Sequence, residues 1–301
     1  MRRIERACLK CVRRLSYSCI DPLLLSYIIF LMMITMAAVT VIDALAQWDA
    51  LTQREDATCN QVKKPSSTAS QNTNTGCPTA WREKIADWCY QVVDHCALGR
   101  DVVSYAMSYF DRIIPHYCIN DTLVELVAMT CLYLAIKVHC SNKISPECMV
   151  SLSRGSFQYD QVVKMERIVL RGLNWHLHPA TPHLFLEIFF STSTDDDELM
   201  TEINETASYL LELAVCDIYF IPKKPSLIAR AAILVAMDIV ARPLRLNAMM
   251  ENLLVNDNCS MVEKCSVRLQ QIYTLMIKQD TAQEIIPESD VSITSVLSVV
   301  S

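Results

Sequence analysis

Residues 121–138 read DTLVELVAMTCLYLAIKV, and this stretch decides the fold. Its apolar residues do not keep to one stripe of a helix, so the helix that it predicts must be covered on all sides. Ala128, Thr130 and Ala135 are small enough to let neighbouring helices approach closely. Lys137 stands near the end of the stretch and carries a charge that has to reach the surface.

The rest of the chain reads as helices arranged around two such stretches. The periodicity predicts helices before the prolines at 179 and 182 over residues 81–96, 101–114, 121–138, 146–153 and 159–173. After these prolines it predicts helices over residues 184–190, 198–219, 225–240, 244–254 and 261–277. The segment AMTCLYLAIK at 128–137 matches ARAAILVAMD at 229–238 in its order of small and large residues. The sequence therefore predicts an all-α protein of two tandem five-helix repeats, each wrapped around an apolar third helix.

Composition excludes several classes of function. The chain has 301 residues, of which 52% are hydrophobic, enough for a sizeable core. Only four glycines are present and no glycine-rich phosphate loop, and the formal charge of −6 argues against nucleic-acid binding. The 14 cysteines show no regular spacing, so they are interpreted as reduced core residues. Cys8 and Cys11 have no second ligand pair, and neither a metal nor a cofactor is predicted.

The N-terminal part differs from the repeats. Residues 22–42 contain no charge and would span about 31 Å as a helix, enough to cross a bilayer. The first 21 residues carry six basic and two acidic side chains, which predicts a cytosolic N-terminus. Several interpretations stay open: the segment 22–42 inserts in a membrane, in this or the reversed orientation; it never inserts; or it belongs to a misassigned protein start. Residues 1–47 form this region, 48–78 are predicted to be a disordered polar linker, and 279–301 are a tail.

The two repeats resemble the cyclin family. In the first repeat the resemblance lies in WREKIADW at 81–88, YFDR at 109–112, LYLAIK at 132–137 and MERIVLRGLNWHL at 165–177. In the second repeat it lies in YLLEL at 209–213 and PSLIARAA at 225–232. It implies an N-terminal cyclin box over residues 79–178 and a C-terminal cyclin fold over residues 179–278.

The resemblance implies a regulatory subunit rather than an enzyme. Cyclins bind and activate a cyclin-dependent kinase as a heterodimer, and so control the cell cycle. The family pattern matches Lys137 and Glu166 to the residues that flank the groove for the kinase's regulatory helix. A Lys and a Glu on an apolar surface offer charge-assisted hydrogen bonds that fix the register of such a helix. The apolar contacts expected beside them are Leu134, Val138, Leu170, Trp175 and Leu177.

The family pattern also implies structural and docking residues. It implies a buried ion pair between Arg82 and Asp87. A docking patch for substrate or inhibitor peptides is matched by Trp81, Lys84, Ile85 and Trp88, where Lys84 departs from the pattern by adding a charge. After the groove lysine many cyclins have an aromatic or apolar residue and two acidic ones. This chain has Val138, His139 and Cys140 there, which predicts that it chooses a different kinase from the cyclins with that pattern.

Two other functions are considered. One is a membrane-anchored helical interaction protein, which would use residues 22–42. The other is a transcription-factor-type cyclin-box protein, which would need a basic face on the second repeat, where basic residues are few and mixed with acids. A kinase activator needs the compartment of its kinase, so the expected location is the nucleus or the cytoplasm.

Overall fold

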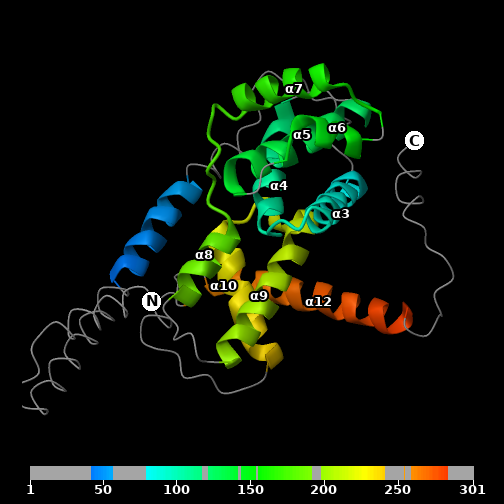
Figure 1. Cartoon of the computed structure of the whole chain (residues 1–301). Helices are drawn as coiled ribbons and strands as arrows, with labels where there is room; N and C mark the ends of the chain where they lie inside the picture. The colour runs from blue at the N-terminus through cyan, green and yellow to red at the C-terminus, as the bar shows by residue number, and fades with distance from the viewer. Residues whose placement is uncertain are drawn as a thin grey trace, which may run out of the picture. The chain divides into compact units, whose positions relative to one another are not determined.

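The computed structural model describes residues 42–56, 79–116, 121–141, 144–153, 155–191, 198–240, 254 and 259–283. Within these residues every regular element is a helix, which confirms the predicted fold class (Figure 1). The chain divides into two compact units, residues 1–47 and residues 48–301. The second unit contains both repeats.

The first repeat surrounds α5 with helices. Its elements are α3 (Thr79–His95), α4 (Val102–Ile113), the short η1 (Ile114–His116), α5 (Asp121–His139), α6 (Pro146–Leu152) and α7 (Tyr159–Gly172). Helix α5 packs against α3, α4, α6 and α7 (Figure 1). Leu132, Ala135 and Ile136 on α5 are fully buried. The covered helix predicted from residues 121–138 is therefore confirmed.

The second repeat has the same plan around α10. Its elements are α8 (Pro182–Ser191), α9 (Glu198–Cys216), η2 (Ile218–Phe220), α10 (Pro225–Val240) and α12 (Cys259–Gln283). Helix α10 packs against α8, α9 and α12, and Ala231, Ala232 and Ile233 are fully buried. The predicted helix over 244–254 lies outside the described residues except for residue 254.

The prediction of one continuous helix from Glu198 to Tyr219 is wrong at its C-terminal end. Helix α9 ends at Cys216, and the turn η2 follows. Asp217 has an extended backbone, and its carboxylate accepts a hydrogen bond of 2.8 Å from the backbone N–H of Tyr219. An Asp that caps a new turn in this way ends one helix and starts another.

The predicted linker is wrong over its first residues, because residues 48–56 are helical. Trp48, Leu51 and Glu55 are buried and spaced along one helical face. The Trp48 ring meets Phe185 of α8 edge-on at 4.8 Å. The Glu55 carboxylate accepts hydrogen bonds from the N–H and the hydroxyl of Ser226, at 2.9 and 2.8 Å. A carboxylate in this position is favourable because it lies at the N-terminus of α10.

The predicted membrane segment falls almost entirely outside the described residues. Of residues 22–42 the structure describes only Ile42. Among the helices that it does describe, none combines the length and the apolar character of a membrane span.

Candidate functional site

Lys137 and Glu166 lie together on the surface of the first repeat. Lys137 is in the last turn of α5, and Glu166 is in the middle of α7. The Lys137 Nζ lies 2.7 Å from Glu166 Oε1, and the two side chains are 49% and 15% exposed. The hydrogen bond with Glu166 raises the pKa of Lys137, so the ammonium stays charged. The ammonium also lies 5.5 Å from the ring centroid of Tyr133.

This pair keeps capacity for a further ligand. A carboxylate accepts hydrogen bonds at both oxygens. The bond from Lys137 goes to Oε1, and within the described residues Oε2 of Glu166 accepts none. The pair can therefore accept a hydrogen bond from a partner at Glu166 while it stays intact.

The apolar residues predicted around the pair divide into two groups. Val138, Leu170 and Leu177 are partly exposed, and Trp175 is 69% exposed. Leu134 is only 2% exposed, so its prediction as a surface contact is corrected. Helices α4 and α7 both pack on α5, and Leu134 belongs to the buried core of this repeat.

A left-handed turn holds Trp175 outward. Asn174 and Trp175 have φ angles of +50° and +60°, a region that costs non-glycine residues roughly 1–2 kcal/mol each. Arg112 of α4 stabilises the turn by donating to the carbonyls of His176 at 3.0 Å and Leu173 at 3.2 Å. Strained backbone of this kind is concentrated at functional sites. The role of Arg112 was not predicted from the sequence, although its place beside Asp111 in the YFDR motif could have marked it.

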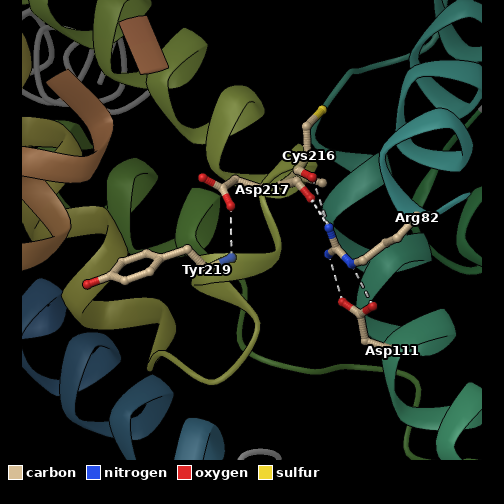
Figure 2. A network of polar contacts seen from close by, with 6 residues as sticks. Arg82, Asp111, Cys216, Asp217 and Tyr219 are labelled. Atoms are coloured by element: carbon tan, nitrogen blue, oxygen red, sulfur yellow. Dashed lines mark hydrogen bonds and ion pairs between the residues drawn. The ribbon is translucent and has the colours of Figure 1, made fainter. Parts of the chain in front are cut away.

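A second polar network joins the two repeats (Figure 2). Arg82 of α3 donates to both carboxylate oxygens of Asp111 on α4, at 2.8 Å each. Its Nη1 donates to the carbonyls of Val215 at 2.8 Å and Cys216 at 3.2 Å, at the end of α9. A cation at a helix C-terminus satisfies carbonyls that lack a helical partner. Arg82 therefore connects α3, α4 and α9 at one point.

The predicted ion pair between Arg82 and Asp87 is wrong. Residues five positions apart on a helix do not lie on one face, whereas residues three or four apart do. Asp87 is exposed, and its contact is the Cys216 thiol at 3.8 Å. Removal from water raises the pKa of Asp87, which is the opposite of what an ion pair would do.

The network continues into the second repeat through Asp217. One carboxylate oxygen of Asp217 caps the N–H of Tyr219 (Figure 2), and the other accepts a hydrogen bond of 2.7 Å from Arg268 of α12. The two arginines, Arg82 and Arg268, thus hold adjacent parts of the break between α9 and η2. This arrangement fixes the junction of the repeats.

The predicted docking patch lies on one side of α3. Trp81 and Trp88 are partly buried, Lys84 is exposed, and Ile85 is 7% exposed. Ile85 therefore belongs to the core rather than to an open patch. Peptide docking at the remaining residues stays a prediction.

The described residues contain no set of His, Cys, Asp and Glu side chains placed to hold a metal ion. Free cysteines among them include Cys89 and Cys131, which are buried, and Cys148, which is exposed. Burial raises the pKa of the Cys89 and Cys131 thiols, so both stay protonated. These thiols pack as core groups, and neither is placed as a nucleophile.

Comparisons with known proteins find relatives of this chain. The chain is 27% identical to the mouse (Mus musculus) G1/S-specific cyclin-D1 over 157 residues, which are 52% of this chain and 53% of the relative. It is 26% identical to the human protein of the same name over 157 residues, again 52% of this chain and 53% of the relative. The chain thus spans about half the length of the curated relatives it matches.

A solved structure shares the fold. It is a viral cyclin from herpesvirus saimiri, with a TM-score of 0.57 and 17% identity, over 67% of this chain and 90% of the viral chain. The sequence profile described as "Cyclin, N-terminal domain" matches residues 48–178, and that described as "Cyclin, C-terminal domain" matches residues 180–289. The two profiles cover both helical repeats and the helix at 48–56, and the chain therefore belongs to the cyclin family.

Proposed function

We propose that the chain is a non-catalytic regulatory subunit that binds and activates a cyclin-dependent protein kinase. The observation that carries the proposal is the ion pair of Lys137 with Glu166 of α7, the helix after whose end Trp175 stands 69% exposed. Tryptophan is enriched among the residues that contribute most of the binding energy at protein interfaces. Family membership supports the kinase as partner.

The surface fits one helix of a partner. Val138, Leu170 and Leu177 offer partly exposed apolar contacts, and Trp175 offers the large anchor. An amphipathic helix docks its apolar face on such a surface. Glu166 would accept from the partner, and this charge-assisted bond would fix the register of the docked helix. When an activator packs this helix of the kinase inward, the helix brings the kinase's own glutamate to the lysine of the ATP site and completes that ion pair.

We further propose a role in cell-cycle control at the transition from G1 to S phase, in the nucleus or the cytoplasm. The names of the curated relatives describe them as G1/S-specific, which supports that transition. A kinase activator has to share a compartment with its kinase and with ATP, which supports that location.

The test uses the purified chain and a panel of cyclin-dependent kinases. At least one kinase should bind and should transfer phosphate to a peptide substrate only when the chain is present. Lys137→Ala and Glu166→Ala should each weaken that binding by roughly tenfold or more, because each removes one half of the pair.

Matched controls are Lys264→Ala and Glu263→Ala, since both side chains are exposed on α12. Neither control should change binding. The proposal is wrong if no kinase binds, or if the α12 variants weaken binding as much as the Lys137 and Glu166 variants do.

A further inference from the structure

His139 ends α5 two residues after Lys137. Its ring stacks on Tyr105 of α4, with centroids 3.6 Å apart and planes within 11°. Its Nε2 lies 2.9 Å from the carbonyl oxygen of Leu177 and 2.9 Å from the hydroxyl of Tyr109. A stack on the face of the ring and hydrogen bonds at one nitrogen therefore fix the orientation of His139.

The hydrogen-bond roles follow from the donors available. Tyr109 also donates its hydroxyl to the carbonyl of Leu177. A carbonyl oxygen has two lone pairs, so it accepts from Tyr109 and from an N–H at Nε2 of His139 together. Burial lowers the pKa of His139, so the ring is neutral at pH 7. Since the Leu177 carbonyl can only accept, the proton of the neutral ring is assigned to Nε2.

The surroundings of His139 are mixed in charge. The groups that face it are Tyr105 and Tyr109 of α4, His178 edge-on at 5.2 Å, Arg54 of the helix at 48–56, and Asp101. Arg54 and His178 oppose a positive charge on the ring, whereas Asp101 favours one. A second proton on His139 would therefore enter a site arranged for the neutral ring.

We propose that His139 is a positioning residue for the partner-binding surface, because its bond to the Leu177 carbonyl keeps Trp175 in register with Lys137. This inference rests on the proposed function. Lys137 lies two residues before His139, and Trp175 lies two residues before Leu177. Two residues span at most about 7 Å, so one hydrogen bond connects the backbone segments that carry both side chains.

The hydrogen bond between His139 and the Leu177 carbonyl matters because of the exposed position of Trp175. The ring is 69% exposed on a turn with positive φ, so its own packing contributes little to its placement. The carbonyls of Leu173 and His176 are held by Arg112 of α4, and the carbonyl of Leu177 by His139 and Tyr109. Among these groups His139 is the one on α5, the helix that also carries Lys137.

The first experiment observes Trp175 without any partner. The full chain is labelled with fluorotryptophan, and the fluorine NMR signals of its four tryptophans are assigned by single substitutions. His139→Phe keeps a ring against Tyr105 but removes the donor, and it should shift the signal of Trp175 while the signal of Trp48 stays in place. His95→Phe is the control, since His95 is exposed at the end of α3.

His139→Gln supplies a second readout of the same contact. Its side-chain amide keeps a donor in place of Nε2, so its Trp175 signal at pH 7 should stay near the wild-type position. An unmoved Trp175 signal in His139→Phe overturns the proposal.

The second experiment measures the dissociation constant of a kinase that the wild-type chain binds. His139→Phe should weaken binding by about tenfold, and His139→Gln should stay within about threefold of wild type. Trp175→Ala should cost less in the His139→Phe background than in wild type, because His139 acts through Trp175. If the losses in binding caused by Trp175→Ala and His139→Phe are additive, the proposal is overturned. If the wild-type chain binds no kinase, the proposed function fails, while the NMR spectra decide separately whether His139 positions Trp175.

Discussion

Arg82→Ala should be one of the most destabilising single changes in the chain. The guanidinium donates four hydrogen bonds, two to the Asp111 carboxylate and two to carbonyls of α9. The side chains of Arg82 and Asp111 are 8% and 15% exposed, so water replaces these bonds poorly. Removing one partner of a buried ion pair typically costs about 3–5 kcal/mol. The expected loss in the free energy of unfolding is therefore about 3–5 kcal/mol.

Urea unfolding followed by circular dichroism measures this loss, and Asp87→Ala is the control. The family pattern implied that Asp87 pairs with Arg82, but Asp87 is exposed and has no arginine partner within the described residues. Its removal should cost less than about 1 kcal/mol, as is usual for exposed side chains.

A double variant separates the pair from its parts. Arg82→Met with Asp111→Leu removes both charges, so no charge is left buried and unpaired, and the double variant should be more stable than the sum of the two single losses implies. The reasoning is refuted if Asp87→Ala destabilises the chain as much as Arg82→Ala, or if Asp111→Ala leaves the unfolding midpoint unchanged.

Two further predictions concern other buried groups. Glu55→Ala should lower the free energy of unfolding by about 1–3 kcal/mol, because the N–H and the hydroxyl of Ser226 lose their acceptor. The control Asp49→Ala, at an exposed position of the same helix, should have little effect. Urea unfolding midpoints compare the two variants, and equal midpoints would contradict the packing of residues 48–56. The Nδ1 atom of His183 lies 2.9 Å from the Ser104 hydroxyl, and burial lowers the pKa of His183 to about 4. The unfolded chain therefore binds a proton below pH 6.5 that the folded chain does not, and about 3 kcal/mol of stability should be lost as the pH falls from 6.5 to 4. Unfolding of His183→Gln over the same pH range should show a smaller loss, and an unchanged pH dependence would contradict the assignment.

The sequence predicts the fold because the apolar pattern is local. Residues 121–138 are apolar on every face, and the helix they form is covered as that pattern requires. The helix at 48–56 was missed for the converse reason. Its buried residues Trp48, Leu51 and Glu55 stand next to a polar stretch of low complexity. The polar composition of the whole segment outweighed the helical spacing of these three residues in the prediction.

The partners of side chains are harder to predict. Arg82 pairs with a residue 29 positions away, and α3 and α4 must pack before that contact exists. The outward position of Trp175 depends on a left-handed turn whose one local signal is Asn174, a residue type that tolerates positive φ. Lys137 and Glu166 were matched through the family pattern, and the structure brings them to 2.7 Å.

A photo-crosslinking experiment tests the central claim most directly. The photoreactive amino acid p-benzoylphenylalanine replaces Trp175 in one variant and Tyr209 of α9 in another, since both rings are exposed in the free chain. With a bound cyclin-dependent kinase, the variant at Trp175 should crosslink to the kinase's regulatory helix, as identified by mass spectrometry, and the variant at Tyr209 should not. Crosslinks at Tyr209 with none at Trp175 would contradict the account.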